Sequence, residues 1–546
     1  MQPLSTRMLS YVERHSTLLV LGLILAGSLR IASTYTVFNH TSDEPAHIAC
    51  GMEWLEKGVY RWEPQHPPLA RVATALLPYL IGLRSANTPP EKRFAMSLDG
   101  AAILYSGGSY DRNLALARLG ILPFFWVGCW VVYAWGKRLF RPAVGVAAVF
   151  LFSFLPPVLA HAGLATTDMA VTALMGGAFL AGMMWLEEPT WGRAAWFGVA
   201  AGLMTLSKFS ALVFFPVSAI LALAWYVYGE KPGWSALAIA AKARIPSFAL
   251  ALFTGAVVIW AGYRFSFGDA GFWHLRLPAP ELYAGIRQVM EHNQVGQDSY
   301  LLGERGHTGF WLFFPVALAV KSPLGFLVLL VVGLVLALRR PVSLPLRVLV
   351  AFSAGILLIG MSSRINIGLR HILPIYVGLS LLSAVALVQL LEWGDTRRWL
   401  QFSLAALVLW MAGSSLLSHP DYLPYFNELA GSEPEKILVD SDLDWGQDLK
   451  RLAARLRELG VTDIAYDPYI LGDPEKQLGF PRIHPTRQSG PSPGWNAMGI
   501  SLWKESGLRE WAGLFPPRER VGKSILLWYF PPVNVNAGIG SPQLPR

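Results

Sequence analysis

Long apolar stretches recur through most of the chain, and each is about as long as a membrane is thick. The hydrocarbon core of a bilayer is about 30 Å thick, which a helix of about 20 mostly apolar residues can cross. The segments that meet or nearly meet this length are residues 16–36, 114–136, 143–160, 169–186, 193–206, 211–228, 246–265, 322–338, 345–361, 371–391 and 398–417. The pattern predicts a polytopic α-helical membrane protein with about eleven transmembrane helices.

Three apolar stretches need a separate interpretation. Segment 193–206 is short for a membrane span, and 309–320 is shorter still, which is typical of a re-entrant or interfacial helix. The first apolar run follows Arg7 and Arg14 and therefore resembles a signal peptide. It lacks a small-residue cleavage site and many further spans follow it, so we interpret it as the first retained helix.

Three longer, more polar segments interrupt the apolar pattern, at residues 37–113, 266–321 and 418–546. In the first of them, residues 44–56 and 67–83 mix apolar and polar positions at helical spacing, which predicts two short helices of the kind that lie along a membrane surface. We expect residues 1–417 to form a transmembrane domain, with 37–113 and 266–321 as its two large extracytoplasmic loops.

The tail after residue 417 has a different composition and predicts a small soluble α/β domain over residues 418–546. Lys436–Val439 and Ser524–Trp528 have the short apolar pattern of buried strands, and Asp448–Leu459 has the spacing of an amphipathic helix. Acidic residues are concentrated between Asp440 and Asp448, but Trp445 and Arg451 stand where an EF-hand needs glycine and glutamate. We therefore interpret this run as a strand-to-helix turn with a capping aspartate.

Basic residues lie mainly in the short loops, which fixes the predicted orientation. Arg7 and Arg14 precede the first span, and the loop with Lys137, Arg138 and Arg141 lies on the same side of the membrane. Short cytoplasmic loops carry an excess of lysine and arginine, whereas long segments cross the membrane largely regardless of charge. The pattern predicts a cytoplasmic N-terminus and an extracytoplasmic, periplasmic tail.

The composition supports the membrane interpretation and limits the function. Hydrophobic residues make up 53% of the chain and charged residues 15%, whereas a soluble protein carries about 25% charged residues. The formal net charge of +9 does not indicate nucleic-acid binding, because the basic residues lie in loops between apolar segments. Cys50 and Cys129 indicate neither a disulfide framework nor a zinc site.

Ionisable residues near a membrane are costly and usually functional, and the predicted topology places many of them on one side. Those at the outer ends of helices or in outer loops are Asp43, Glu44, His66, Asp168, Lys208, Arg264, Lys321, Arg364, Arg370 and His371. A single extracytoplasmic site, acidic on one side and basic on the other, explains this distribution.

Two interpretations stay open for the acidic candidates. Asp43 and Glu44 directly follow the first span, where two adjacent carboxylates can raise one pKa for general-base catalysis. The structural alternative is that Ser42 or Asp43 caps a helix with Pro45 in its first turn. Asp168 is either a first-turn residue of the following helix or a ligand of the acceptor or a metal.

Four cations beside apolar segments suit a lipid phosphate, namely Lys208, Lys321, Arg364 and Arg370. Each one alone is explained by snorkelling to the membrane interface. As a set without matching acids beside them in sequence, they favour an anionic ligand, because phosphate prefers arginine and lysine partners.

The order of several short motifs resembles the protein O-mannosyltransferase superfamily, within the GT-C class of membrane glycosyltransferases. That group also includes the transferase that adds aminoarabinose to lipid A. The resemblance covers residues 15–395, whereas the tail does not resemble the β-trefoil of the eukaryotic mannosyltransferases. The motifs that carry it are Ser42–His47, Gln65–Leu69, Ala165–Asp168, Leu206–Ser210, Val320–Pro323 and Gly368–Pro374.

The resemblance implies single-step, inverting transfer of a monosaccharide from a dolichyl- or undecaprenyl-phosphate carrier to a protein, lipid or glycan acceptor, in a bacterial inner membrane. By position, Asp43 is the implied general base, and Glu44 orients the acceptor or supports Asp43. The remaining assignments are Lys208, Lys321, Arg364 and Arg370 to the lipid phosphate, and His47, His66, Asp168 and His371 to the acceptor or sugar. No nucleotide cofactor is implied, and a divalent metal with Asp43 and Asp168 as ligands is left open.

Two other functions are alternatives to this one. An oligosaccharide transferase or ligase that uses a lipid-linked oligosaccharide usually depends on further acidic metal ligands, for which Asp168 is the obvious candidate. A lipid or sugar transporter predicts inverted repeats and charged groups near the middle of the membrane. The sequence shows neither of these transporter features.

Overall fold

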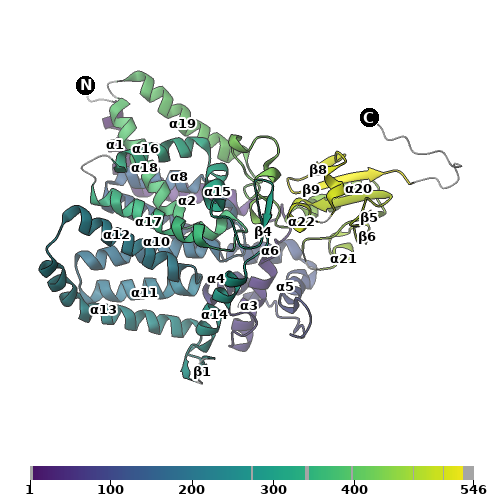
Figure 1. The fold of residues 1–546 in the computed structure, drawn as a ribbon, viewed down its shortest axis with the longest axis horizontal. Coiled ribbons are helices and arrows are strands. Elements are labelled where there is room, and N and C mark those ends of the chain that lie inside the picture. The colour runs from purple at the N-terminus through teal and green to yellow at the C-terminus, as the bar shows by residue number, and fades with distance from the viewer. Residues whose placement is uncertain are drawn as a thin grey trace.

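The structure is a computed structural model that describes residues 4–271, 275–338, 343–394, 397–470, 472–507 and 509–532. It consists of a large helix bundle with shorter helices and a β-sheet at one end (Figure 1). The bundle helices are α1 (Leu4–Arg14), α2 (Ser16–Ala32), α7 (Leu122–Leu139), α8 (Pro142–Ser153), α9 (Pro156–Ala162), α10 (Asp168–Glu187), α11 (Trp191–Ser207), α12 (Ala211–Glu230), α13 (Trp234–Gly262), α15 (Phe313–Lys321), α16 (Leu324–Leu338), α17 (Leu344–Ser362), α18 (Ile375–Trp393) and α19 (Arg398–Leu417).

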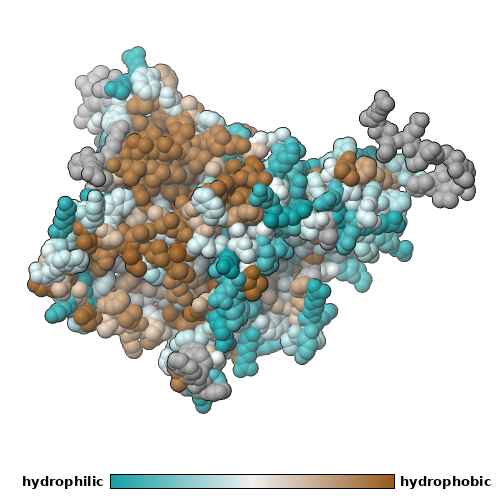
Figure 2. Space-filling view, viewed as in Figure 1, coloured by the Kyte–Doolittle hydropathy of each residue, from teal (hydrophilic) through white to brown (hydrophobic). Residues whose placement is uncertain are grey.

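Every predicted apolar segment contains a helix, and the chain is an integral membrane protein. Among the described residues, 7 helices are long and apolar enough to cross a membrane, and three bent pairs raise the number to 10. The remaining predicted span corresponds to α11, which is 17 residues long. Figure 2 shows hydrophobic residues gathered over the bundle and hydrophilic residues over the end that carries the sheet.

Prolines mark two of the bends. The pair α8 and α9 is bent by 70° at Leu155–Pro156, and the pair α15 and α16 by 119° at Ser322–Pro323. A residue before proline is disfavoured in the helical conformation, so the helix ends there and the chain changes direction. The short apolar stretch at 309–320, expected to be re-entrant or interfacial, thus contains the short helix α15, which is sharply bent from α16.

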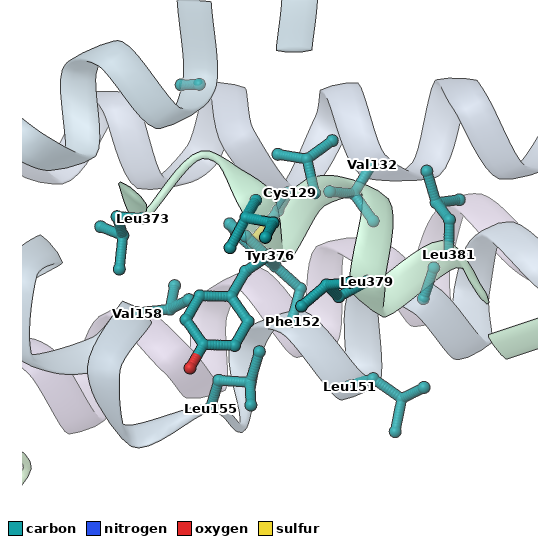
Figure 3. Close-up of a cluster of buried hydrophobic side chains, with 14 of the residues drawn as sticks. Cys129, Val132, Leu151, Phe152, Leu155, Val158, Leu373, Tyr376, Leu379 and Leu381 are labelled. Atoms are coloured by element: carbon teal, nitrogen blue, oxygen red, sulfur yellow. The ribbon is translucent and has the colours of Figure 1, made fainter. Parts of the chain in front are cut away.

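The centre of the bundle is packed where α7, α8, α9 and α18 meet. Cys129, Phe152 and Tyr376 are each 0% exposed there, and Figure 3 shows their side chains among leucines and valines of the same helices. Helices in lipid associate through close packing because lipid tails are as apolar as the side chains. Gly136 illustrates the packing, since a Cβ there would lie 2.5 Å from Gly145 Cα on the facing helix.

Short helices cover the end of the bundle that carries the sheet. They are α3 (Glu44–Lys57), α4 (Pro68–Leu80), α5 (Ala95–Tyr105), α6 (Tyr110–Leu119) and α14 (Pro280–Val295), with the hairpins β1 (Phe267–Asp269) with β2 (Arg276–Pro278) and β3 (Ser299–Leu301) with β4 (Glu304–Gly306). The first two confirm the helices predicted over 44–56 and 67–83. α3 ends at Gly58, whose φ of 67° is the left-handed conformation that terminates many helices.

The tail contains a five-stranded sheet in the order β6-β5-β7-β9-β8. The sheet and its helices are α20 (Leu449–Glu458), β5 (Asp463–Ala465), α21 (Pro474–Leu478), β6 (Arg482–His484), β7 (Gly494–Gly499), α22 (Ile500–Ser506), β8 (Glu519–Val521) and β9 (Ile525–Phe530). β5 runs parallel to β6 and β7, whereas β9 runs antiparallel to β7 and β8. Leucines of α20 pack with β5 and β9 in a core of their own.

The predicted helix at 448–459 and the predicted strand at 524–528 are confirmed as α20 and β9. The predicted strand Lys436–Val439 is wrong, because this stretch follows the 3-10 turn Pro434–Lys436 and precedes another at Asp440–Asp442. Leu438 and Val439 are nevertheless buried, with exposed fractions of 0% and 2%. A short apolar run shows that a segment is buried, but not which backbone conformation buries it. Residues 533–546 of the predicted tail domain lie outside the described residues.

Candidate active site

Asp43 and Arg370 meet at the end of the bundle that carries the tail. Asp43 immediately precedes α3, and Arg370 lies in a 3-10 turn, Leu369–Ile372, before α18. Arg370 Nη1 donates a hydrogen bond to Asp43 Oδ2 at 3.0 Å. Asp43 occupies the helix-capping position, but its side chain makes no capping hydrogen bond. Its carboxylate therefore contacts Arg370 and does not cap the N-terminus of α3.

A second acid–base pair adjoins the first. Lys208, which follows α11, donates from Nζ to Asp168 Oδ1 at 2.6 Å, and Asp168 begins α10. Arg370 Nη1 lies 4.0 Å from Asp168 Oδ2. Two acids and two bases from four separate segments thus form one connected cluster, which we call the charged quartet.

The quartet is unevenly exposed. The side chain of Asp168 is 1% exposed, that of Arg370 8% and that of Lys208 10%, whereas that of Asp43 is 38% exposed. Buried ions are tolerated when they are paired and hydrogen-bonded. Asp43 is therefore the member that a reacting molecule from outside can reach, and the other three define its charged surroundings.

Histidines form the next layer. His66 Nδ1 lies 3.1 Å from Glu63 Oε2, and Arg71 Nε donates to His47 Nδ1 at 3.0 Å. The rings of His47 and His66 meet edge to face, with centroids 5.2 Å apart. Arg71, which is 1% exposed, also contacts Glu63. It therefore joins both histidines into one network.

His371 follows Arg370 and lies among the same charges. Burial lowers its pKa well below the usual range, and the positive charges of Lys208 and Arg370 lower it further. Burial and Arg71 likewise lower the pKa of His47. Both imidazoles are therefore neutral near pH 7. His371 Nε2 is buried and has no hydrogen-bond partner among the described residues, so it is available to a bound molecule.

Glu44 lies apart from the quartet, in a fully buried ion pair. Arg118 donates from Nε to Glu44 Oε1 and from Nη2 to Glu44 Oε2, both at 2.8 Å. Glu44 also accepts from the backbone of Thr41 and Ala165. Burial alone would raise the pKa of Glu44, but Arg118 and these hydrogen bonds hold it below its usual value. Glu44 thus joins the loop before α3 to the loop before α10, which favours a positioning role.

Replacing Glu44 should therefore act on stability. Glu44→Ala leaves the charge of Arg118 buried without its partner, which typically costs about 3–5 kcal/mol. We expect a large fall in the melting temperature of the purified protein. The control is Glu458→Ala, which removes an exposed partner of Arg455 and should cost no more than about 1 kcal/mol. A Glu44→Ala protein that melts like the wild type but has lost its activity would instead place Glu44 directly in catalysis.

The other two predicted cations are placed differently from Arg370. Lys321 is 2% exposed and donates from Nζ to the carbonyl oxygens of Leu423 at 2.7 Å and Asp442 at 2.5 Å. Arg364 is exposed and donates to the Gln294 carbonyl at the end of α14. Lys208 and Arg370 are therefore the two predicted phosphate ligands that the structure brings together.

The two candidate metal ligands, Asp43 and Asp168, each contact a basic side chain. In the part of the chain that the structure describes, no group of three or more His, Cys, Asp or Glu side chains could hold a metal ion. A divalent metal with these ligands stays a prediction of the sequence.

Acids of the tail lie close to the quartet. Burial raises the pKa of Asp440 from 3.8 to about 7, although Arg370 opposes the shift. Burial and Asp440 together raise the pKa of Glu505 to about 10. Asp43 is also among the charges that raise the pKa of Asp440. Glu505 is therefore protonated near pH 7, whereas Asp440 titrates in that range.

This burial predicts a pH-dependent stability. Because the pKa of Asp440 is raised, the folded protein holds more protons than the unfolded chain between pH 3.8 and about 7, so stability is lost as pH rises through that window. Asp440→Asn keeps the neutral form at every pH. We expect its melting temperature, relative to the wild type, to increase across the window and to stay higher above it. A difference that does not change with pH would contradict this account.

Sequence reasoning missed three members of these networks, namely Glu63, Arg71 and Arg118. Arg71 and Arg118 belong to segments with helical apolar spacing, and both are 1% exposed. An arginine on the apolar face of a predicted helix is a signal for a buried partner, because an unpaired buried charge is too costly. The spacing of residues in the sequence does not show which acidic residue is that partner.

Two crystal structures of ArnT share this fold, and a third solved structure matches it less closely. The crystal structure of ArnT from Cupriavidus metallidurans in the apo state has a TM-score of 0.50 at 13% sequence identity, covering 93% of this chain and 97% of that one. The crystal structure of ArnT bound to undecaprenyl phosphate has a TM-score of 0.50 at 14% identity, covering 96% and 99%. The archaeal oligosaccharyltransferase AglB from Archaeoglobus fulgidus, in complex with an inhibitory peptide and a dolichol-phosphate, has a TM-score of 0.46 at 13% identity, covering 88% and 69%.

A family model described as dolichyl-phosphate-mannose-protein mannosyltransferase matches residues 113–261, which include Asp168 and Lys208. No curated protein sequence matches the chain. The resemblance to the GT-C membrane glycosyltransferases, predicted from the order of the motifs, is confirmed by this match and by the fold shared with ArnT.

Proposed function

We propose that this protein is an inverting glycosyltransferase that moves a monosaccharide from a polyprenyl-phosphate carrier to a hydroxyl acceptor on the outer face of the membrane. One observation carries the proposal: an accessible carboxylate, Asp43, lies in contact with Arg370, which adjoins Asp168 and Lys208. A base and cations are thus adjacent at one end of the bundle. Inverting transfer from a phosphate carrier needs both.

The comparisons support a lipid-phosphate donor. The matching family model is named for a transferase that uses a dolichyl-phosphate sugar. ArnT, which has the same fold, has been crystallised with undecaprenyl phosphate. A polyprenyl phosphate is also chemically suited to the site, because its anionic head group requires cations and its tail requires lipid.

The reaction is a single displacement. The acceptor oxygen attacks the anomeric carbon of the donor sugar while the bond from that carbon to the phosphate oxygen breaks. Asp43 takes the proton from the acceptor hydroxyl, as general-base catalysis requires. Polyprenyl phosphate leaves with the bonding electron pair, and Arg370 and Lys208 stabilise the negative charge that develops on it. Fixed cations in a partly buried site suit this task, because they need no rearrangement as the charge forms.

The loop charges and the arrangement of the bundle support a site on the outer face. Figure 1 shows the N-terminus and the five-stranded sheet at opposite ends of the bundle. The quartet lies at the end of the bundle that carries the tail, because Ser42 and Arg370 both contact tail residues. With a cytoplasmic N-terminus, the site faces the periplasm of a bacterial inner membrane. The acceptor is then a protein, lipid or glycan of the cell envelope.

The test is transfer by the purified protein from radiolabelled polyprenyl-phosphate monosaccharides to a cell-envelope extract. The proposal expects label to move to a discrete acceptor and free polyprenyl phosphate to accumulate. Labelling only from a carrier that holds an oligosaccharide would favour an oligosaccharide transferase. Passage of the intact lipid or sugar across vesicles without bond cleavage would favour a transporter.

A further inference from the structure

One stretch of the tail, Asp440–Gly446, reaches into the charged quartet, and we call it the tail loop. Arg370 Nε donates to Ser441 Oγ at 3.0 Å. The guanidinium carbon of Arg370 also lies 4.0 Å from the ring centroid of Trp445, which is a cation–π distance. Ser441 and Trp445 are both 1% exposed. The side chain of Arg370 is therefore held from its edge and from its face by two residues of the tail.

The tail loop also holds the backbone on which Arg370 sits. The backbone N–H of Leu369 donates to both carboxylate oxygens of Asp442 at 3.2 Å, and Ser441 Oγ donates to the carbonyl of Ile367. Gly368 lies between them with a φ of 144°, and a Cβ there would lie 2.1 Å from Ser441 Oγ. A side chain at position 368 would therefore displace Ser441 Oγ, and it would be strained by this positive φ.

The same loop fixes the segment that carries Asp43. The backbone N–H of Ser42 donates to the Trp445 carbonyl at 3.2 Å, and Asn39 Nδ2 donates to the Gly446 carbonyl at 2.6 Å. Both bonds lie within a few residues of Asp43 in the chain. One short loop thus contacts both the segment that contains the proposed base, Asp43, and the segment that contains the proposed phosphate ligand, Arg370.

We propose that the tail loop is a positioning element of the transferase, in which Ser441 and Trp445 orient the Arg370 guanidinium toward the donor phosphate. This inference rests on the proposed function. A guanidinium is planar and offers five N–H donors in a fixed fork. With Nε directed at Ser441, Nη1 at Asp43 and one face on Trp445, its plane is set before the donor arrives, and its other donors serve the phosphate. The tail is then part of the active site.

The experiment measures binding of undecaprenyl phosphate to the full-length protein in detergent micelles, for the wild type and four variants. Trp445→Leu removes the aromatic face and should weaken binding about five- to thirtyfold, the range of a desolvated cation–π contact. Trp445→Phe keeps an aromatic face and should remain within about threefold of the wild type. Ser441→Ala should weaken binding about three- to tenfold, the effect of losing one ordinary hydrogen bond.

Ser218→Ala is the matched control, because Ser218 is also a buried serine, and its hydroxyl donates to the Phe352 carbonyl, away from the tail loop. It should bind undecaprenyl phosphate like the wild type. In transfer assays, Ser441→Ala should raise the KM for the donor and leave that for the acceptor unchanged, a split that general loss of structure does not produce.

Wild-type binding combined with unchanged affinity in both Ser441→Ala and Trp445→Leu would overturn this inference and leave the proposed function intact. If Trp445→Leu does not fold, the comparison of Ser441→Ala with Ser218→Ala decides. A wild-type protein that neither binds undecaprenyl phosphate nor transfers sugar from it would overturn the proposed function, and the inference with it.

Discussion

Asp43→Asn is expected to reduce sugar transfer by about 10²–10⁴-fold, the contribution of a positioned general base. Asparagine has nearly the shape of aspartate, and its side-chain oxygen can still accept from Arg370, so the site should keep its geometry. It cannot take a proton from the acceptor. Expression and affinity for the lipid carrier should therefore remain close to those of the wild type, while turnover is lost.

The matched control for this variant is Asp111→Asn. Asp111 also contacts a basic side chain, with Lys450 Nζ at 2.7 Å from its carboxylate, but it is not a member of the quartet. Transfer should remain near the wild-type rate in that variant. Unchanged turnover in Asp43→Asn would remove Asp43 as the base and leave the mechanism without a proton acceptor.

Arg370→Ala is expected to have the second large effect, on both donor affinity and turnover. Removing one preorganised donor to a developing negative charge typically costs about 10²–10³-fold in rate. Arg370→Lys keeps the charge, but a single ammonium cannot reproduce the planar fork that contacts Ser441 and Asp43. We therefore expect the lysine variant to recover only part of the activity.

The comparison for Arg370 is Arg455→Ala. Arg455 contacts Glu519 and Glu458 at the surface of the tail, and exposed ion pairs of this kind contribute about 0–1 kcal/mol. Donor affinity should be unaffected by its loss. An Arg370→Ala protein that binds undecaprenyl phosphate and turns over like the wild type would contradict the phosphate assignment.

Most of the helix bundle could be predicted from the sequence, because lipid imposes a simple rule on the chain. A spanning segment must satisfy its own backbone hydrogen bonds and present apolar side chains, and both requirements are visible in hydropathy. The bend at Leu155–Pro156 was not predicted, although the proline that causes it is plain in the sequence. The strand predicted at Lys436–Val439 was wrong because several backbone conformations can bury a short apolar run.

The candidate site was predictable as a location but not as a set of contacts. Topology alone placed Asp43, Asp168, Lys208 and Arg370 on one side of the membrane. The cations were expected to lack acidic partners nearby. Lys208 and Arg370 instead pair with acids that come from other segments of the chain. Sequence spacing carries no information about such pairs. The tail loop was missed for the same reason, since its contacts to Ser42 and Arg370 join residues that lie far apart in the sequence, 71 positions apart for Arg370 and Ser441.

The central claim is that a lipid phosphate binds where Arg370 and Lys208 adjoin the carboxylate of Asp43. A structure of the protein with bound undecaprenyl phosphate tests it most directly. The account predicts a phosphate oxygen within about 2.7–2.9 Å of the Arg370 guanidinium, on the same side of the membrane as the tail. A phosphate bound at the opposite end of the bundle, beside Lys137, Arg138 and Arg141, would contradict it.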